Sequence, residues 1–197
     1  MKIGVLSFQG DYINHINILD ELQVESQKVR YPIDLDSINA LIIPGGESTA
    51  ISNLIDKQKM YDPIKRFIKK KPVYGTCAGL ILLASTVMRD DEIDTQIKTF
   101  NLLNLEVKRN GWGRQVESFS ANLDIKSFTN SYKAIFIRAP KIISRDRNIT
   151  VLSEYSKSPT MIKKGHILGT TFHPELTKDT RIHEYFIKMI KEHIIAC

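Results

Sequence analysis

A cysteine stands at the centre of the segment Gly75-Thr76-Cys77-Ala78-Gly79. The segment follows a short apolar strand and opens an apolar helix, which is the context of a nucleophile elbow with cysteine in place of serine. Such a turn directs the central side chain into the site, and the helix N-terminus favours a thiolate. With two cysteines and ten glycines in 197 residues, a GxCxG match arises by chance only about 0.005 times. We therefore predict that Cys77 is a nucleophile, with a buried core cysteine as the alternative.

A cysteine nucleophile needs a base, and the chain has five histidines. Four of them are expected at the surface, on amphipathic helices or after a turn: His15, His166, His183 and His193. The fifth, His173, ends a predicted strand and begins the sequence His173-Pro174-Glu175. Residues i and i+2 of an extended segment point the same way, so Glu175 could accept the ring N–H of His173 and hold its tautomer. We predict that His173 is the base and Glu175 its orienting partner.

A third segment that could take part in catalysis or binding is Pro44-Gly45-Gly46-Glu47-Ser48-Thr49, which follows an apolar strand. Its two glycines let the backbone approach a ligand closely. Ser48 or Thr49 could cap the helix that follows. A backbone N–H of this loop could complete an oxyanion hole with the N–H of Ala78, the residue after the nucleophile.

The elements that must position these segments alternate in the first half of the chain. Hydrophobic patterns predict strands at 2–8, 26–31, 40–43 and 72–75, and helices at 12–23, 48–70 and 78–88. The second half is richer in strands, at 103–109, 115–124, 133–137, 149–155, 159–163 and 166–172, and it closes with a helix at 179–195. This order predicts one α/β domain over residues 1–197, with a mostly parallel sheet covered on both faces. The three segments fall at carboxyl ends of strands, where such sheets bind ligands.

Composition excludes several other classes of protein. The chain is 42% hydrophobic and 25% charged, as expected of a soluble globular protein. Its formal charge of +6 is spread out, and the densest basic run, Lys65–Lys71, fits the solvated face of an amphipathic helix, so we expect no nucleic-acid partner. No segment has the length of a membrane span or the pattern of a signal peptide. Two cysteines without a CxxC spacing predict neither a disulfide framework nor a metal site, and they suit the cytoplasm; Cys197 receives no role.

Together these segments resemble the class I (triad) glutamine amidotransferases, and among them the family of glutaminase subunits of pyridoxal 5′-phosphate synthase, the PdxT type. The motifs that carry the resemblance span nearly the whole chain: Gly4-Val5-Leu6, Gln9-Gly10, PGGEST at 44–49, YGTCAGLI at 74–81, Arg109-Asn110, Gly113-Arg114-Gln115, Ser118-Phe119, FIRAP at 136–140, Leu152-Ser153-Glu154 and TFHPELT at 171–177. Trp112 stands where the family usually has a smaller aromatic residue, and Asn14 where an acidic residue is common, which we expect to affect the pocket or the partner surface.

The resemblance implies a three-layer, flavodoxin-like fold and a Cys77-His173-Glu175 triad. It also implies an oxyanion hole from Gly46 and Ala78, and a partner-sensing role for Gln9. The glutamine-binding positions that it implies are Gly46, Glu47, Ser48, Arg109, Ile137 and Arg138. The expected activity is hydrolysis of L-glutamine without cofactor or metal. The ammonia would pass to a (β/α)₈-barrel synthase subunit in a hetero-oligomer for vitamin B6 biosynthesis.

The sequence leaves three other interpretations of the function open. A glutaminase subunit of another ammonia-channelling synthase, such as imidazole glycerol phosphate synthase, would share the elbow and His-Pro-Glu, but not PGGEST with IRAP. A cysteine peptidase or chaperone-like hydrolase on a similar fold would lack His-Pro-Glu. A non-catalytic binding module would normally lose the cysteine, the histidine or the glutamate.

Overall fold

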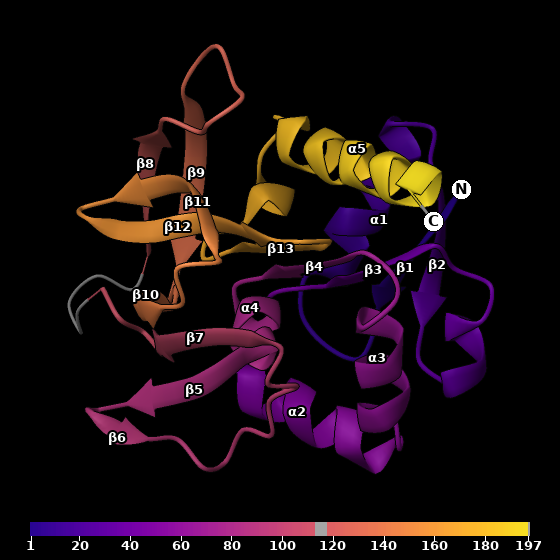
Figure 1. Cartoon of the computed structure of the whole chain (residues 1–197), viewed down its shortest axis with the longest axis horizontal. Coiled ribbons are helices and arrows are strands. Elements are labelled where there is room, and N and C mark those ends of the chain that lie inside the picture. The colour runs from indigo at the N-terminus through magenta and orange to yellow at the C-terminus, as the bar shows by residue number, and fades with distance from the viewer. Residues whose placement is uncertain (113–117, 197) are drawn as a thin grey trace.

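The computed structural model describes residues 1–112 and 118–196, and its centre is a seven-stranded sheet (Figure 1). The spatial order is β11-β12-β13-β4-β3-β1-β2. Five neighbouring strands run parallel: β1 (Lys2–Leu6), β2 (Glu25–Val29), β3 (Ala40–Ile43), β4 (Val73–Thr76) and β13 (Ile167–Thr170). Two antiparallel strands extend one edge: β12 (Ser158–Lys164) and β11 (Thr150–Tyr155). The predicted mostly parallel sheet is therefore confirmed.

Helices cover both faces of this sheet, as Figure 1 shows. On one face lie α1 (Tyr12–Glu21) and α5 (Arg181–Ala196). On the other lie α2 (Ser48–Lys57), α3 (Tyr61–Ile68) and the six-residue α4 (Ala78–Leu83). Apolar strands such as β3, whose four residues are all buried, separate two hydrophobic clusters, one on each side of the sheet. This burial on both faces explains why central parallel strands such as β3 have continuous apolar sequences rather than alternating ones.

Two smaller sheets flank the central one. The first has the order β10-β7-β5-β6 and the second pairs β8 with β9. Their strands are β5 (Ala84–Arg89), β6 (Glu92–Ile93), β7 (Leu103–Lys108), β8 (Ser118–Leu123), β9 (Tyr132–Ile137) and β10 (Lys141–Arg145). The sequence predicted β7, β8 and β9, but it missed β6 and β10. Short 3₁₀ segments occur at η1 (Pro32–Leu35) and η2 (Pro174–Leu176).

The helix predicted at 48–70 is in fact two helices. Lys59 has a φ of 55°, and the Met60 N–H donates to the Ile55 carbonyl at 2.8 Å, which is the hydrogen bond of a Schellman C-cap. Pro63 reinforces the break, because within one continuous helix its ring would clash with the carbonyl of Lys59. The buried Met60 then packs beside Ile55 in the core.

The helix predicted at 78–88 ends at Leu83, and residues 84–89 form β5 instead. Ala84 has extended backbone, with a ψ of 161°. Ser85 Oγ donates to the Leu105 carbonyl at 3.0 Å and accepts from the Leu105 N–H at 3.1 Å. Pairing with β7 therefore overrides the apolar run, which by itself fits a buried helix equally well.

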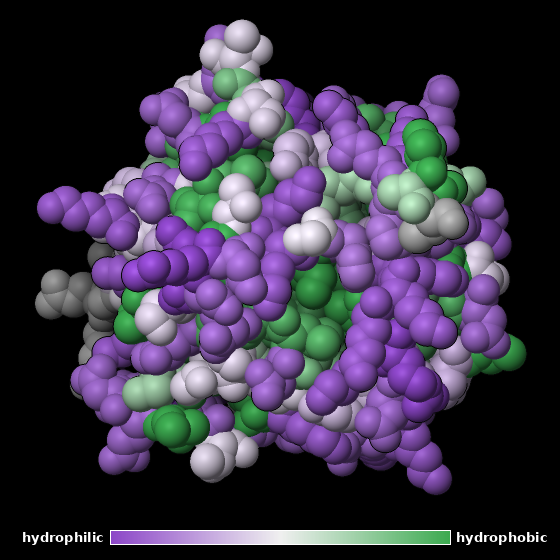
Figure 2. Space-filling model, viewed as in Figure 1, coloured by the Kyte–Doolittle hydropathy of each residue, from purple (hydrophilic) through white to green (hydrophobic). Residues whose placement is uncertain are grey.

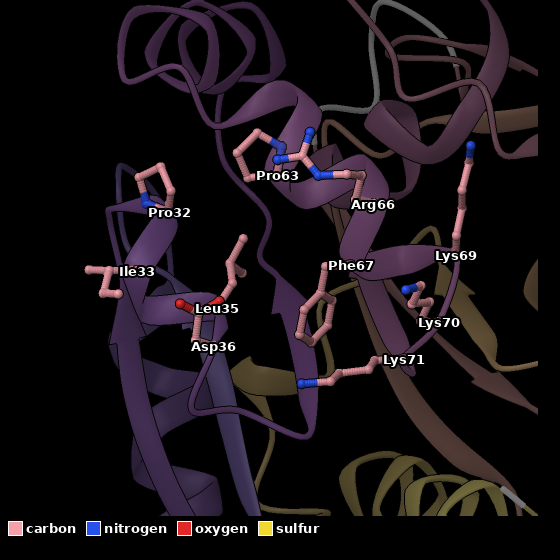
Figure 3. A pocket seen from close by; sticks show the side chains of 10 residues that line it. All are labelled: Pro32, Ile33, Leu35, Asp36, Pro63, Arg66, Phe67, Lys69, Lys70 and Lys71. Carbon is pink, nitrogen blue, oxygen red and sulfur yellow. The ribbon is translucent and has the colours of Figure 1, made fainter.

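Hydrophilic residues cover most of the face seen in Figure 2, with small hydrophobic patches between them. The basic run Lys65–Lys71 begins on α3 and continues past its end, and it behaves only partly as predicted. Lys69 and Lys70 are exposed, but Lys71 lies over the Phe67 ring and donates to the Ile38 carbonyl at 2.7 Å. Together with η1 this run lines a groove, shown in Figure 3, that contains none of the predicted site residues. Among the described residues, no helix is long and apolar enough to cross a membrane.

Candidate active site

Cys77 occupies a strained turn between β4 and α4. Its φ of 47° and ψ of −102° lie outside the regions that side chains normally adopt. The Cys77 N–H donates to the Thr170 carbonyl at 2.8 Å, which fixes the turn to β13. A Cβ on Gly79 would lie 2.0 Å from the carbonyl oxygen of Ile43, and one on Gly75 would lie 2.7 Å from the carbonyl carbon of Gly79. Both glycines are therefore required by close backbone packing, as the elbow pattern implies.

The Cys77 side chain is 5% exposed, and its sulfur lies 4.0 Å from the carbonyl oxygen of Ile137. The first hydrogen bond of the following helix is that from the Ile81 N–H to the Cys77 carbonyl, at 3.2 Å. The N–H groups of the residues between them, starting with Ala78, precede this bond and have no acceptor within the helix. The Ala78 N–H is therefore not used in the hydrogen bonds of α4.

His173 and Glu175 are brought together beside the cysteine. His173 Nδ1 lies 2.7 Å from Glu175 Oε1, and the two residues are only 4% and 5% exposed. The predicted contact is present, but the predicted extended backbone is not: His173 caps η2, so Pro174 and Glu175 start a 3₁₀ turn. Burial alone lowers the pKa of His173. Hydrogen bonds and charges from Cys77 and Glu175 outweigh it and raise that pKa to about 11.

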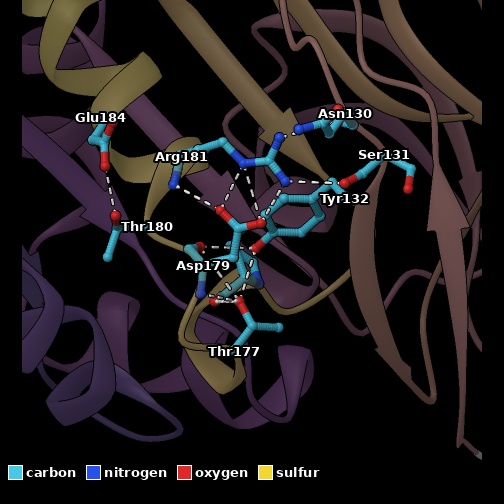
Figure 4. A network of polar contacts seen from close by, with 9 residues as sticks. Asn130, Ser131, Tyr132, Thr177, Asp179, Thr180, Arg181 and Glu184 are labelled. Carbon is cyan, nitrogen blue, oxygen red and sulfur yellow. Dashed lines mark hydrogen bonds and ion pairs between the residues drawn. The ribbon is translucent and has the colours of Figure 1, made fainter.

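A polar network holds the chain just after Glu175 (Figure 4). The Tyr132 hydroxyl lies 3.0 Å from Thr177 Oγ1, joining β9 to the end of η2. Arg181 Nη2 donates to Asp179 Oδ2 at 2.6 Å and to the Ser131 carbonyl at 3.0 Å. At the other end of the turn, the His173 N–H donates to the Ile135 carbonyl at 2.8 Å. Both ends of the His173–Glu175 turn are therefore bonded to β9 or to the loop before it.

The loop at 44–49 packs against the loop that follows β1. Gly46 has a φ of +149°, and a Cβ on Gly10 would lie 2.0 Å from the Gly45 carbonyl oxygen. Gln9 Oε1 accepts the N–H of Glu47 at 3.0 Å. A Cβ on Gly45 itself would lie 2.4 Å from Cε1 of His173. The structure thus places this loop directly beside the His173 ring, with the Gln9 side chain holding it.

Glu47, rather than Ser48 or Thr49, caps α2. Its carboxylate accepts the N–H groups of Thr49 at 3.1 Å and Ala50 at 2.6 Å, and it pairs with Arg109 Nη2 at 2.7 Å. Burial raises the Glu47 pKa, but these hydrogen bonds and the Arg109 charge outweigh it and lower the pKa. Arg109 Nη1 also pairs with Asp94 Oδ2 at 2.7 Å. Two of the predicted glutamine-binding side chains therefore bind each other in this structure, while Ser48 is buried in the first turn of α2.

The two remaining predicted positions lie at the end of β9. Ile137 is 37% exposed, and Arg138 has a φ of 41°. Nearby, Trp112 Nε1 donates to the Pro140 carbonyl at 3.3 Å, and its ring packs edge-on against Phe136. Trp112 thus packs behind the end of β9. The motif residues 113–115 lie outside the described residues.

The expectation that four histidines lie at the surface is wrong for two of them. His15 and His183 are both fully buried, and His15 Nδ1 lies 2.9 Å from His183 Nε2. Burial lowers the pKa of each, to about 4 for His183; the charges of His183 and His173 lower that of His15 further. One signal was available: both histidines come three and four residues before buried apolar residues of the same helix, Ile18 and Leu19 in α1 and Phe186 and Ile187 in α5.

The other two histidines are partly exposed. His166 Nε2 lies 2.6 Å from the Ile68 carbonyl oxygen, and His193 Nε2 lies 2.9 Å from that of Lys70.

One cluster of potential metal ligands lies at the site: Asp11, His173 and Glu175 offer ligand atoms within 4.8 Å of one another. Within this set, His173 Nδ1 and Glu175 Oε1 already bond to each other.

Comparison with known proteins gives matches over nearly the whole chain. The SNO glutamine amidotransferase family matches residues 5–192. The chain is 42% identical to "Pyridoxal 5′-phosphate synthase subunit PdxT" of Thermosipho africanus, over 98% of this chain and 100% of the relative. It is 45% identical to the protein of the same name from Pseudothermotoga lettingae, over 96% and 95%. A solved structure, "Crystal structure of glutamine amidotransferase", superposes with a TM-score of 0.88 at 36% identity, covering 96% of this chain and 98% of that one.

Proposed function

This chain belongs to the SNO glutamine amidotransferase family, and from that premise we propose that it hydrolyses the side-chain amide of L-glutamine and supplies the ammonia to pyridoxal 5′-phosphate synthase as its glutaminase subunit. The observation that carries the proposal is Cys77 on a strained elbow beside the buried His173–Glu175 pair. Nearly full-length relatives named as the PdxT subunit of that synthase support the same assignment. They favour it over the glutaminase of imidazole glycerol phosphate synthase.

The first half of the proposed reaction forms a thioester. The Cys77 thiolate attacks the side-chain carbonyl carbon of glutamine, and the carbonyl oxygen takes up the electron pair. N–H groups of Ala78 and Gly46 stabilise this oxyanion. Protonated His173, favoured by its raised pKa, gives its proton to the departing nitrogen, which leaves as ammonia.

The second half returns the enzyme to its starting state. Neutral His173 takes a proton from a water molecule, which attacks the thioester carbonyl. The carbon–sulfur bond breaks, glutamate leaves and Cys77 recovers its thiolate, so that glutamine and water give glutamate and ammonia. Glu175 holds the His173 ring through Nδ1 in both steps, which keeps the other ring nitrogen facing the reacting atoms.

We propose that the substrate lies between the Gly46–Ser48 loop and the Ile137–Arg138 segment, because Gly45, which precedes the loop, and Ile137 both border Cys77. Arg138 suits the α-carboxylate of free glutamine. We propose that Glu47 and Arg109 act mainly on the loop, since each already bonds to the other and Arg109 also bonds to Asp94.

We also propose that a (β/α)₈-barrel synthase subunit switches this site on by docking. Ammonia released into solvent wastes glutamine, so hydrolysis is useful only when an acceptor is in place. The glycines at 45 and 46 allow a peptide flip that could turn an N–H towards or away from the oxyanion. Gln9 bonds to the next peptide at the Glu47 N–H, and is therefore placed to stabilise one of the two states.

Glutamate release by the purified chain, alone and with its synthase subunit, tests the proposal. We expect weak activity alone, strong activity in the complex, and in the Cys77→Ala variant a loss of several orders of magnitude with the fold retained. Cys197→Ala, the change of the other cysteine, is the matched control and should stay active. Retention of more than about a tenth of the activity by Cys77→Ala would reject the nucleophile. Equal activity with and without the partner, unaffected by Gln9→Ala, would reject only the switch.

A further inference from the structure

Glu175 is bonded on one side only. Its Oε1 contacts His173 Nδ1 at 2.7 Å, but its buried Oε2 has no hydrogen-bond partner within residues 1–112 and 118–196. The ring nitrogen His15 Nε2 lies 3.5 Å from this oxygen, at the outer edge of bonding distance. A buried carboxylate oxygen without a donor is costly, so the protonation of His15 Nε2 matters to the triad.

The hydrogen-bond partners of His15 and His183 favour one nitrogen of His15 as the proton carrier. If Nδ1 carried it, His15 would donate to His183 Nε2 at 2.9 Å. His183 would then hold its proton on Nδ1, a buried atom without a partner in the described parts of the chain, and the bare His15 Nε2 would face the carboxylate. If each ring carries its proton on Nε2, His183 donates to His15 Nδ1, and the protonated Nε2 of His15 lies 3.5 Å from Glu175 Oε2. Only this second arrangement leaves no buried N–H unpaired.

The surroundings of His15 favour a neutral ring in this tautomer. Besides His183 from α5 and Glu175 from η2, Thr76 of β4 faces it, with Oγ1 3.4 Å from His15 Nε2. Tyr74 of the same strand packs edge-on against it, with ring centroids 6.4 Å apart. His15 Nε2–H is thus shared between a hydroxyl that can accept and a carboxylate that must accept.

We propose that His183 and His15 extend the Cys77–His173–Glu175 triad into a buried relay, in which His15 is a positioning residue that donates from Nε2 to the second oxygen of Glu175. By donating to His15 Nδ1, His183 fixes the tautomer of His15. It thereby sets the direction, from donor to acceptor, in which the hydrogen bonds of the relay run. The reaction of the proposed function needs the His173 ring held in one orientation, and Glu175 can hold it only if its own carboxylate group cannot rotate. The inference rests on the proposed function, but the tautomers can be read without it.

The first test is nitrogen-detected NMR of the histidine rings in the wild-type chain near pH 7. We expect neutral His15 and His183, each with its proton on Nε2. A proton on Nδ1 of His15, or a charged His15, would overturn the relay. Because this measurement needs no turnover, it decides the relay even if the chain shows no glutaminase activity, an outcome that would defeat only the proposed function.

The second test is steady-state glutaminase kinetics in the complex with the synthase subunit. His15→Leu should lower kcat between about 10- and 100-fold, because a misplacement of about 1 Å costs up to about 100-fold, and KM should stay close to wild type. His15→Gln keeps an amide N–H donor and should recover much of the loss. His193→Leu, a histidine change on the same helix as His183, should match the wild type. His183→Leu should show a mixture of His15 tautomers and a smaller loss of kcat.

An unchanged kcat in His15→Leu would refute the positioning role. The positioning role would also be refuted if His15→Leu and His15→Gln lost the same amount of kcat and the same amount of thermal stability, since that result would indicate a packing role alone. If His15→Leu fails to fold, His183→Leu and the wild-type NMR spectra still decide: a single unchanged His15 tautomer in His183→Leu would refute the proposed direction.

Discussion

Replacing Arg109 by Met tests how the loop beside the active site is held. The guanidinium group pairs with Asp94 and Glu47, at 2.7 Å each, and its side chain is 16% exposed. The two carboxylates differ in burial: the Asp94 side chain is 2% exposed and that of Glu47 is 41% exposed. Methionine keeps the length of the stem but removes the charge, so Asp94 is left buried without its counter-ion.

The expected cost follows from this difference in burial. Breaking a buried ion pair by removing one partner costs about 3–5 kcal/mol, whereas an exposed pair contributes about 0.2–1 kcal/mol. Asp94 keeps one other hydrogen bond, from the Gln96 N–H at 3.1 Å. We therefore expect the free energy of unfolding to fall by about 3 kcal/mol, most of it from Asp94.

Urea denaturation measures this loss. The matched control is Lys98→Met, which removes an ion pair of the same 2.7 Å length between Lys98 and Asp56, side chains that are 54% and 60% exposed. It should cost far less stability than Arg109→Met, because water screens an exposed pair. Adding Asp94→Asn to Arg109→Met should recover much of the loss, because a neutral amide needs no counter-charge. Equal effects of Arg109→Met and Lys98→Met would refute this reasoning. A glutamine KM that stays high in the stabilised double variant would show instead that Arg109 binds the substrate directly.

Two further predictions concern the elbow. Cys77→Ala should lower the pKa of His173 from about 11, because burial then opposes only Glu175; His173 titration by NMR in both proteins measures this, and an unchanged pKa would contradict the coupling. Gly79→Ala places a Cβ 2.0 Å from the Ile43 carbonyl oxygen and should cost more than about 3 kcal/mol in urea denaturation. Gly165→Ala, which meets nothing within 4 Å but has a φ of +56°, should cost only about 1 kcal/mol.

The sequence was sufficient for the alternating elements and for the local parts of the site. GxCxG between a strand and a helix specifies an elbow, since each glycine is required by contacts within a few residues of the turn or with the adjacent strand. His173 and Glu175 are two residues apart, so their contact survives even though the backbone between them is a 3₁₀ turn rather than a strand. The loop at 44–49 was also located correctly, because its glycines follow an apolar strand that ends at the same edge of the sheet.

Only the tertiary structure decided the features that depend on distant partners. The run at 78–88 fits a buried helix by composition, and its second half became β5 because β7 offers backbone partners. Arg109 could be named only from a resemblance, and its ion pairs with Glu47 and Asp94 appear only when three separate segments meet. His15 and His183 lie 168 positions apart. A polar residue at the border of an amphipathic stripe can be buried or exposed, and the packing of α1 against α5 determines which, because it supplies or withholds the hydrogen-bond partner that makes burial possible.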